Sequence, residues 1–370
     1  MVIERFDLIV VGAGIVGAAC AEAAAAAGLR VVVIERSIVG GATSAAAMGH
    51  LVALDGCAAE LALAAASLRL WQRFADEPSC EFRRCGTLWL ARSEAELHNL
   101  PARIAALAEA GIEAEQVSPK ALYRLEPALA PGLAGGLRVP GDAVVYPPAV
   151  ASHLLALACA AGAELRVGQN VRALDEVGVR LDDGRKLHGQ VLIATGVALP
   201  QLLPELPLRA RKGHLLITRR EPPQIRHQLI EMGYADSVHS DGTAVAFNLQ
   251  PRPTGQLLLG SSREYDSTDP AVSLAVLGAM LRRAFEFVPA LRGLQALRVW
   301  TGLRPATPDG LPYLGPVPGR RGVWVAAGHE GLGVTTALAS AQLMVTALLG
   351  RPAPIDPTPY LPARVLEAAA

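Results

Sequence analysis

The chain has 370 residues and carries 34 basic and 34 acidic side chains, so its formal net charge is +0. Hydrophobic residues make up 51% of the chain and charged residues 18%, a composition that excludes intrinsic disorder. The balanced charge also gives no electrostatic reason to expect a nucleic acid as partner. At roughly 150 residues per domain, the length predicts two or three domains.

The cysteines and the apolar stretches bear on where the protein works. Five cysteines occur without a C-x-x-C pair or a zinc-type spacing, which indicates small buried hydrophobic side chains in a reducing compartment. Two long apolar stretches, residues 8–28 and 323–349, contain glycines and charged side chains that would be costly in lipid. We therefore expect a cytoplasmic protein with no signal peptide and no transmembrane segment, and peripheral association with the inner face of a membrane remains an alternative.

The first predicted elements form a β-α-β unit. The apolar pattern predicts a strand at residues 7–11, a helix at 15–27 and a strand at 30–35. These strands are apolar throughout, as is typical of a parallel sheet covered on both faces. Alanine-rich tracts further along predict more helices, because alanine is the strongest helix former. The later elements are, in chain order, a helix at 58–74, β-like segments at 83–91, helices at 93–110 and 147–161, strands at 164–167, 177–181, 190–194, 215–218, 244–249 and 256–260, a helix at 272–287, a strand at 322–327 and a helix at 332–349.

A glycine motif joins the first strand to the first helix. Gly12, Gly14 and Gly17 have the spacing G-x-G-x-x-G. In dinucleotide-binding proteins these glycines permit a tight turn, a close approach of the backbone to the pyrophosphate, and close packing of helix and strand. The helix N-terminus offers N–H groups to the phosphates, and Glu35, which ends the next strand, would accept hydrogen bonds from the ribose hydroxyls and disfavour NADP. The motif predicts a Rossmann-like dinucleotide site that suits FAD or NAD.

The order of the predicted elements indicates how the domains are arranged. Helix-rich α/β segments lie at both ends of the chain and strands dominate the middle, with no Gly/Ser-rich or Pro-rich linker between them. We therefore expect an α/β fold in which a discontinuous Rossmann-like domain receives an inserted α+β substrate domain with an antiparallel sheet. The predicted boundaries assign residues 1–80, 142–200 and 296–370 to the nucleotide domain, and residues 81–141 and 201–295 to the substrate domain.

Further segments favour a bulky, phosphate-bearing ligand. The small residues of GGATSAAAMG at 40–49 let the backbone and the hydroxyls of Thr43 and Ser44 approach it, and VLIATG at 191–196 ends a second strand against the same site. With GLRPATPDGLPYLG at 302–315 and GHEGLG at 328–333, nearly the whole chain resembles the D-amino-acid oxidase and glycine oxidase group of flavoproteins. Within that group, the stretches RKGHLLIT, GSSREYD and GHEGLGVTTA look most like D-hydroxyproline dehydrogenases, and similar to the flavin subunits of opine oxidase and hydrogen cyanide synthase.

The resemblance implies bound FAD, a discontinuous FAD-binding domain, a β-rich substrate domain and oxidation of an amino acid at its Cα–N bond. No second G-x-G-x-x-G occurs, so a nicotinamide co-substrate has no site of its own and electrons must leave by another route. The flavin supplies the chemistry, and no metal or protein nucleophile is required. The residues that we predict to contact FAD are Gly12, Gly14, Ile15, Val16, Gly17, Glu35, Arg36, Thr43, Ser44, Met48, Gly49, His50, Val171, Thr195, Gly196, Gly302, Arg304, Gly331, Leu332, Gly333, Val334 and Thr335.

Arg304, His329 and Asn248 are the predicted catalytic residues. The resemblance implies that Arg304 anchors the substrate carboxylate, for which a planar guanidinium is suited, and the alternative is a structural arginine held by a buried carboxylate such as Asp309. His329 is either catalytic or held by packing and backbone contacts. The resemblance also implies a tyrosine at the position of Asn248, so Tyr234 or Tyr265 would have to replace it, and a cyclic or unusual amino acid becomes a better candidate than glycine.

Other residues near these motifs have two interpretations each. Glu330 is either part of the site or a helix-start residue that interacts with the helix dipole, and Met48 is either a cofactor contact or a core residue. The main alternative for Lys212 is a surface lysine, and Arg263 is either a pocket residue or an exposed charge. The segment 328–333 leads into a helix whose N-terminal N–H groups would face the flavin pyrimidine edge.

The sequence predicts an FAD-dependent amino-acid dehydrogenase that acts on a D-amino or cyclic imino acid such as D-hydroxyproline. A glycine or D-amino-acid oxidase that uses oxygen is one alternative. Another is the flavin subunit of a multi-subunit complex, in which a partner subunit or the respiratory chain accepts the electrons, since no iron–sulfur cysteine pattern is present in this chain. A homo-oligomer or hetero-oligomer fits these expectations, and a simple NAD-dependent dehydrogenase is a third alternative.

Overall fold

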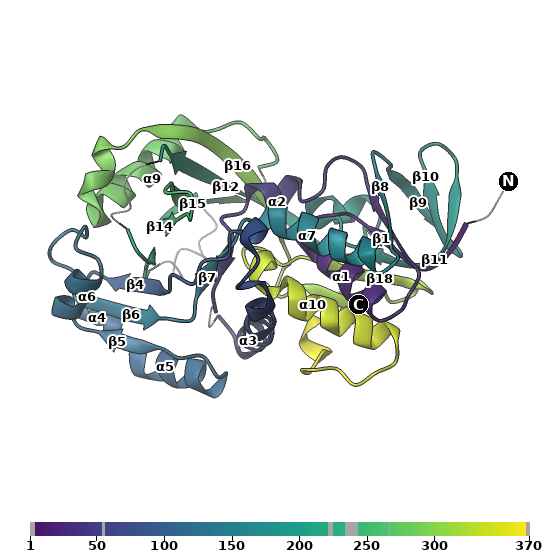
Figure 1. The fold of residues 1–370 in the computed structure, drawn as a ribbon, viewed down its shortest axis with the longest axis horizontal. Helices are drawn as coiled ribbons and strands as arrows, with labels where there is room; N and C mark the ends of the chain where they lie inside the picture. The colour runs from purple at the N-terminus through teal and green to yellow at the C-terminus, as the bar shows by residue number, and fades with distance from the viewer. Residues whose placement is uncertain (1–3, 54–55, 221–224, 234–242, 266, 368–370) are drawn as a thin grey trace.

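The computed structural model describes residues 4–53, 56–220, 225–233, 243–265 and 267–367. Two large sheets lie side by side along the long axis of the molecule, and each has helices packed on it (Figure 1). The chain crosses between the two halves several times, so neither half is one continuous stretch of sequence.

The first sheet is mainly parallel. Its order is β17-β18-β11-β1-β2-β8, and the hairpin of β9 and β10 extends it beside β11. The pairs β1–β2, β1–β11, β2–β8 and β11–β18 are parallel, whereas β17 and the hairpin pair antiparallel. The strands of this sheet are β1 (Glu4–Val11), β2 (Val31–Glu35), β8 (Glu164–Val167), β9 (Val171–Asp175), β10 (Gly178–Leu181), β11 (Lys186–Ile193), β17 (Tyr313–Pro316) and β18 (Val323–Ala327).

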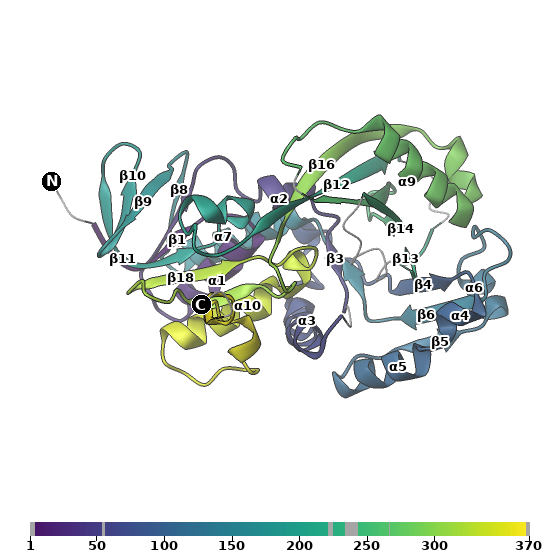
Figure 2. The same ribbon diagram turned by 180° about the vertical axis from the view of Figure 1, so that it is seen from behind.

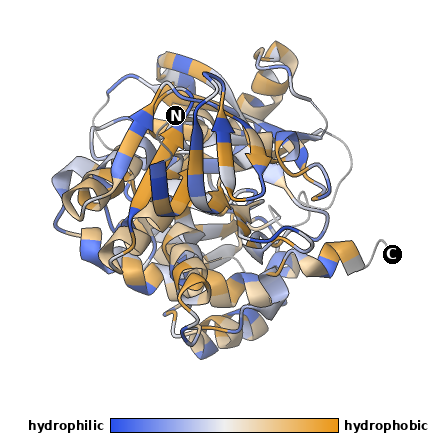
Figure 3. Ribbon diagram, turned by 90° about the vertical axis from the view of Figure 1, so that its right-hand side faces the viewer, coloured by the Kyte–Doolittle hydropathy of each residue, from blue (hydrophilic) through white to orange (hydrophobic). Residues whose placement is uncertain are grey.

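Helices and short segments cover both faces of this sheet, which explains its apolar strands. On one face Leu8 and Val10 of β1 pack with the helices α1, α3, α7 and α10, and on the other Ile9 and Val11 pack with leucines of the segment after β11. Apolar residues run through the strands and helices at this end of the molecule (Figure 3). The covering elements are α1 (Ile15–Ala26), α3 (Ala58–Trp71), α7 (Pro147–Ala160), α10 (Gly333–Leu348) and the 3-10 helix η3 (Gly196–Gln201).

The second sheet has the order β16-β12-β15-β14-β13-β4-β6-β5, and all of its pairs are antiparallel except β13–β4. Helix α9 (Leu274–Phe287) covers the face that carries Phe247, which stacks on Phe287 with ring centroids 4.6 Å apart. Figure 2 shows α9 on this sheet, and α5 on its far edge. The strands are β4 (Thr87–Ala91), β5 (Glu115–Val117), β6 (Gly135–Val139), β12 (Arg209–Thr218), β13 (Gln228–Glu231), β14 (Ala244–Pro251), β15 (Leu257–Tyr265) and β16 (Ala296–Ala306).

Short elements complete the fold. A two-stranded sheet of β3 (His50–Leu51) and β7 (Ala143–Val144) lies between the two large ones. The predicted helix at 93–110 is divided into α4 (Glu94–Leu97) and α5 (Leu100–Glu109), because Pro101 suits the start of a helix rather than its interior. The remaining helices are α2 (Ala42–Ala46), α6 (Pro119–Leu125), α11 (Ala363–Glu367), and the 3-10 helices η1 (Gln72–Phe74), η2 (Pro78–Cys80), η4 (Pro289–Gly293) and η5 (Thr358–Tyr360).

The predicted fold class, an α/β fold with an antiparallel second sheet, is confirmed. The domain boundaries remain a prediction, and β16, which they assign to the nucleotide domain, hydrogen-bonds with β12 along the second sheet. The expectation that the cysteines are buried is correct for Cys20 and Cys80 and wrong for Cys57 and Cys159, which are exposed. Among the described residues, no helix combines the length and apolar character that crossing a lipid bilayer requires.

Candidate functional site

A cavity of about 590 Å³ joins the two sheets. Its wall includes the carboxyl ends of β1 and β2 in the first sheet, and residues of β12, β14, β15 and β16 in the second. The carboxyl ends of parallel strands are where open α/β sheets bind their ligands. We call the part beside β1 and β2 the nucleotide end, and the part beside the second sheet the substrate end.

The glycine motif shapes the nucleotide end. Gly12 has a φ of +107°, and a Cβ there would lie 2.6 Å from the carbonyl oxygen of Ala194. A Cβ on Gly17 would lie 2.0 Å from the carbonyl oxygen of Gly12, so helix α1 can approach β1 only with glycine at this position. Gly14 is the N-cap of α1 and has no side chain to cap the helix. The Ser44 hydroxyl takes the Ile15 N–H, and the next N–H groups of the first turn, those of Val16 and Gly17, are available to an anion.

Glu35 lies on the wall of the nucleotide end. Its Oε2 accepts a hydrogen bond from the Ala13 N–H at 2.8 Å, and its Oε1 accepts one from the Ser37 N–H at 2.8 Å. A carboxylate has about four acceptor positions, so two remain for ligand hydroxyls. Gln169 and Val171, which follow β8, line the same end.

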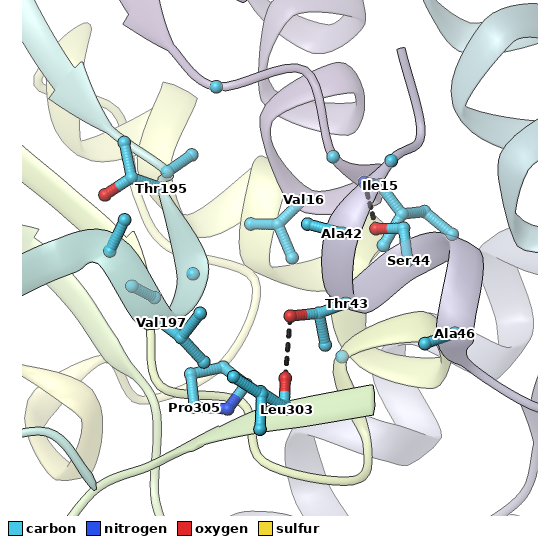
Figure 4. Close-up of a pocket in the computed structure, with 18 of the residues that line it drawn as sticks. Ile15, Val16, Ala42, Thr43, Ser44, Ala46, Thr195, Val197, Leu303 and Pro305 are labelled. Carbon is cyan, nitrogen blue, oxygen red and sulfur yellow. Dashed lines mark hydrogen bonds between the residues drawn. The ribbon is translucent and has the colours of Figure 1, made fainter. Parts of the chain in front are cut away.

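The middle of the cavity is bordered by α1, α2 and the turn after β11. Figure 4 shows Thr195 and Val197 on one side of the space, with Val16, Ala42 and Thr43 opposite. The Thr43 hydroxyl donates to the carbonyl oxygen of Leu303 at 2.8 Å. The Ser44 hydroxyl accepts from the Ile15 N–H at 3.0 Å. Both predicted hydroxyls therefore line the cavity, and both also hold the site together.

Arg304 lies at the substrate end, on β16. Its Nη1 donates to the carbonyl oxygen of Ser262 at 3.2 Å, and the guanidinium lies so close to Gly213 that a Cβ there would be 2.6 Å from Nη1. Within the described part of the chain, no carboxylate lies within ion-pair distance of this guanidinium. Asp309 is bound to Arg364 instead, with 2.6 Å between Oδ2 and Nε. The alternative in which Asp309 holds Arg304 is therefore wrong.

Glu330 reaches the cavity from the segment before α10. Its N–H donates to the carbonyl oxygen of Pro305 at 3.0 Å, and its φ of +45° is left-handed, which is uncommon for a side chain of this size. Its Oε1 accepts from Nη1 of Arg211 at 3.2 Å, and its Oε2 accepts from the Gly331 N–H at 2.6 Å. Because α10 begins only at Gly333 and has no acidic residue in its first turn, the helix-start interpretation of Glu330 is wrong.

The charges around Glu330 keep it ionised. Burial raises its pKa, but the guanidinium groups of Arg304, Arg263 and Arg211 outweigh that effect and bring the pKa below its ordinary value. Arg263 and Lys212 are only 5% and 3% exposed, so the surface interpretation of Lys212 is wrong, and so is the exposed interpretation of Arg263. The substrate end therefore lies against a buried cluster of charges on the second sheet.

The two histidines of the site are neutral. Burial lowers the pKa of His329 to about 4, and its Nε2 shares a hydrogen bond with the Ser340 hydroxyl at 3.0 Å. Burial, with the nearby Arg304, lowers the pKa of His50 to about 4 as well. The hydrogen bond to Ser340 favours a packing role for His329, whereas Nε2 of His50 is buried and has no hydrogen-bond partner in the described part of the chain.

Of the two tyrosines proposed to replace the one missing at Asn248, only Tyr265 lies among the described residues, and it does not take that place. Tyr234 lies outside the described residues. Tyr265 is not on the cavity wall, because its ring lies against the Arg211 guanidinium, 4.4 Å from the ring centroid. Asn248 itself is on the wall and 3% exposed. Met48 also lines the wall, and its sulfur packs against Gly260.

Most of the predicted site residues lie on one cavity wall, and three do not. Gly17 packs against the Gly12 carbonyl, Leu332 is the buried N-cap residue of α10, and the Thr335 hydroxyl donates to the carbonyl oxygen of His50 at 2.9 Å. The predicted residues on the wall are Gly12, Gly14, Ile15, Val16, Glu35, Arg36, Thr43, Ser44, Met48, Gly49, His50, Val171, Thr195, Gly196, Asn248, Gly302, Arg304, His329, Gly331, Gly333 and Val334.

Several lining residues were not predicted from the sequence. Gln169 and Asn170 lie just after the end of β8, a strand of the parallel sheet, so their place after a strand end was a usable signal. Gly213, Leu215 and Ser261 have no such signal, because only the pairing of β12 and β15 with their neighbours brings them to the cavity.

The wall fits a long ligand with polar groups along its length. Four buried side-chain atoms on it have no hydrogen-bond partner in the described structure: Oε1 of Gln169, Oγ1 of Thr195, Nε2 of His50 and Oδ1 of Asn248. Buried polar atoms are nearly always hydrogen-bonded, so these four mark places for ligand atoms. They extend from the nucleotide end through the middle to the substrate end. An adenine dinucleotide with a ring system at its other end, as in FAD, matches this distribution.

Comparisons with known proteins agree with this geometry. Residues 7–347 match the family model of FAD dependent oxidoreductases. The chain is 30% identical to the glycine oxidase of Pseudomonas aeruginosa, over 96% of this chain and 98% of that one. It is 26% identical to the HcnC subunit of hydrogen cyanide synthase from the same species, over 98% of this chain and 96% of that one. The crystal structure of the glycine oxidase of Geobacillus kaustophilus superposes with a TM-score of 0.87 at 27% identity and covers 97% of this chain and 98% of that one.

The family match spans nearly the whole chain and includes both sheets and the cavity between them. The chain therefore belongs to the DAO family of FAD-dependent oxidoreductases, and its cofactor is FAD.

Proposed function

We propose that this enzyme is a dehydrogenase that oxidises an amino acid at its Cα–N bond, and that its substrate is a D-amino acid or a cyclic imino acid such as D-hydroxyproline. The observation that carries the proposal is Arg304. It presents a guanidinium to the substrate end of the cavity and has no carboxylate within ion-pair distance among the described residues.

A guanidinium in this setting suits a carboxylate ligand. It can form two parallel N–H···O bonds, which fix the orientation of the substrate as well as binding it. The contact with the Ser262 carbonyl and the close approach of Gly213 hold the side chain in place before a ligand arrives. A substrate held at its carboxylate keeps its Cα at a fixed place in the cavity, which hydride transfer requires.

The reaction needs little chemistry from the protein. A hydride leaves Cα and a proton leaves the nitrogen, so the amino acid becomes an imine, which stays cyclic or is hydrolysed to a keto acid. When bound, FAD supplies the two-electron acceptor for the hydride. The side chains of this chain bind and orient the substrate, and the neutral His329 and His50 add no positive charge beside its nitrogen.

Asn248 supports a substrate other than glycine. The resemblance to glycine oxidases implies a tyrosine at its position, and asparagine is smaller, which leaves more room beside Arg304. Its Oδ1 is buried on the wall with no partner among the described residues, so it can accept a hydrogen bond from a substrate N–H or hydroxyl. Room together with an acceptor is what a ring-shaped, hydroxylated amino acid would use.

Two observations favour alternative electron acceptors. The 30% identity to a glycine oxidase favours oxygen, and the 26% identity to the HcnC subunit favours a partner subunit. The two alternatives share the oxidation of the amino acid and differ only in how the reduced enzyme is reoxidised.

The test is an anaerobic screen of the purified holoenzyme. The visible absorbance of the flavin is followed while D- and L-proline, D- and L-hydroxyproline, glycine, sarcosine and an opine are added one at a time. We expect a cyclic or D-amino acid to bleach the flavin fastest and a dye to reoxidise it faster than oxygen does. If no amino acid bleaches the flavin, the proposal is wrong, and faster reoxidation by oxygen would make the enzyme an oxidase.

A further inference from the structure

Glu330 brings a carboxylate to the same end of the cavity as Arg304. Its N–H bonds to the carbonyl of Pro305, the residue next to Arg304, so the two side chains start from adjacent points of the backbone. Arg211, the ion-pair partner of Glu330, lies directly opposite Arg304 on the neighbouring strand β12. Two like charges in this register repel each other, and Glu330 is the anion beside both.

The Glu330 carboxylate has capacity left for a ligand. Of its roughly four acceptor positions, one takes the Arg211 guanidinium and one the Gly331 N–H. Its side chain is 20% exposed, and the residue is part of the cavity wall. The left-handed φ of +45° carries a backbone cost that a glycine at this position would avoid. Backbone strain of this kind is concentrated at functional sites, which fits a functional role for the carboxylate.

The charges of a bound ligand decide whether Glu330 attracts or repels it. A carboxylate that binds Arg304 places a second negative charge near Glu330. A ligand with a hydroxyl or an ether on the carbon next to its carboxylate leaves that repulsion uncompensated. An ammonium or iminium nitrogen on the same carbon donates N–H groups to Glu330 and offsets the repulsion. A hydroxyl can also donate a hydrogen bond to a carboxylate, but it carries no positive charge, so its bond to Glu330 is weaker than the charge-assisted bond from an ammonium or iminium N–H.

We propose that Glu330 accepts a hydrogen bond from the substrate nitrogen and thereby makes the site selective for amino acids over hydroxy acids with the same carboxylate and carbon skeleton. This inference rests on the proposed function and deepens it. Arg304 holds one end of the zwitterion and Glu330 the other. Because the arginines keep it ionised, Glu330 orients the nitrogen and does not take its proton.

The test uses two probes that cannot be oxidised because they lack a hydrogen on Cα. 2-Aminoisobutyrate and 2-hydroxyisobutyrate differ only in the nitrogen or oxygen on that carbon. Their dissociation constants are measured from the perturbation of the flavin absorbance of the holoenzyme. We expect the wild type to bind the amino probe at least tenfold more tightly, and Glu330→Gln to bring the ratio close to one. Any general gain in carboxylate binding at the freed arginines affects both probes and cancels in the ratio.

Two further variants complete the design. Glu264→Gln changes another carboxylate of the same charged region, which lies 3.3 Å from Nδ1 of His214 and is not on the cavity wall, and we expect it to keep the wild-type ratio. Glu330→Asp keeps the charge in a backbone conformation that aspartate tolerates, and we expect it to keep part of the preference. If Glu330→Gln does not retain FAD, the Asp variant decides, because a shortened carboxylate should lower the ratio severalfold.

The inference is overturned if the wild type shows no preference between the probes or binds neither of them. It is also overturned if the ratio of dissociation constants is unchanged in Glu330→Gln, or, where that variant does not bind FAD, in Glu330→Asp. The same holds if Glu264→Gln lowers the ratio as much as Glu330→Gln does. These outcomes are distinguishable from failure of the proposed function. If the proposed function fails, no amino acid bleaches the flavin in the anaerobic screen. If only the inference about Glu330 fails, an amino acid still bleaches the flavin, and the discrimination between nitrogen and oxygen is absent.

Discussion

The two ends of the cavity are built from different parts of the polypeptide. At the nucleotide end the backbone provides most of the fit: glycines at 12 and 17 allow a close approach, the first turn of α1 offers N–H groups, and one carboxylate, Glu35, is fixed by two backbone N–H groups. At the substrate end side chains provide the fit, above all Arg304, Glu330 and Asn248. The nucleotide end therefore recognises the shape of its ligand, and the substrate end recognises the charge of its ligand.

The surroundings of the two ends differ in the same way. The parallel sheet beside the nucleotide end has apolar residues on both faces. The antiparallel sheet beside the substrate end buries Arg211, Lys212 and Arg263, all at most 5% exposed. Buried charges lose their hydration, which is costly unless they are compensated, and a charged ligand at the substrate end contributes to that compensation. The comparison predicts that substitutions at the two ends will separate cofactor binding from substrate binding.

The largest expected effect comes from Gly17→Ala, at the nucleotide end. The new Cβ would lie 2.0 Å from the Gly12 carbonyl oxygen, so α1 must move away from the turn that receives the cofactor. We expect FAD affinity to fall by roughly 100-fold, about 3 kcal/mol, measured by fluorescence titration of the apoprotein. Gly141→Ala is the control, because its Cβ would meet nothing within 4 Å. Equal FAD affinity in both variants would contradict the packing role of Gly17.

Arg304→Ala is expected to have an effect of about the same size, at the substrate end. Loss of two charge-assisted hydrogen bonds should raise the substrate KM by roughly 100-fold, about 3 kcal/mol, while FAD stays bound. Arg364→Ala is the matched control, because this arginine is bound to Asp309 and does not line the cavity. A KM that is unchanged in the Arg304 variant, or raised equally in the control, would remove Arg304 from the substrate site.

The smallest expected effect per pH unit is on stability, which pH should change in opposite directions through one group in each region. Burial lowers the pKa of His329 to about 4, so the unfolded chain binds more protons below pH 6.5 and stability falls as the pH drops from 6.5 towards 4. Burial beside the second sheet raises the pKa of Asp142 to about 8, despite the lowering effects of Thr87 and Arg103. The native state then holds an extra proton between about pH 4 and 8, so this group makes stability fall as the pH rises through that window.

Asp142→Asn and His329→Asn separate the two contributions. Each wild-type group contributes a slope of up to about 1.4 kcal/mol per pH unit within its window. The measurement is urea unfolding of the holoenzyme at several pH values. We expect Asp142→Asn to remove a decline in stability towards alkaline pH, and His329→Asn to remove one towards acid pH. Slopes identical to those of the wild type would show that these groups titrate normally in the folded protein.

The nucleotide end was largely predictable from the sequence because its features are local. The G-x-G-x-x-G motif, the strand before it and the acid after the next strand lie within one short segment, and the predicted helix at 15–27 is found at Ile15–Ala26. The resemblance to the D-amino-acid oxidase group and its FAD are confirmed. Gly17 was predicted both to let helix and strand pack closely and to contact the cofactor; the close packing on the Gly12 carbonyl is found, and Gly17 does not line the cavity.

The substrate end was predictable only in part, because strand pairing assembles it. Strand β16 carries exposed residues at its start and a proline at 305, so it lacks the apolar pattern of a strand and was missed, although it holds Arg304. Lys212 was interpreted as a surface residue because sequence does not distinguish a buried charge from an exposed one. For the same reason Asp309 was a candidate partner of Arg304, and only the structure shows that Asp309 pairs with Arg364.

The most direct test of the account is a crystal structure of the holoenzyme with 2-aminoisobutyrate. We expect the probe at the substrate end, with its carboxylate within hydrogen-bond distance of both terminal nitrogens of Arg304. The account is contradicted if the probe occupies the cavity with its carboxylate elsewhere and Arg304 touches no ligand atom.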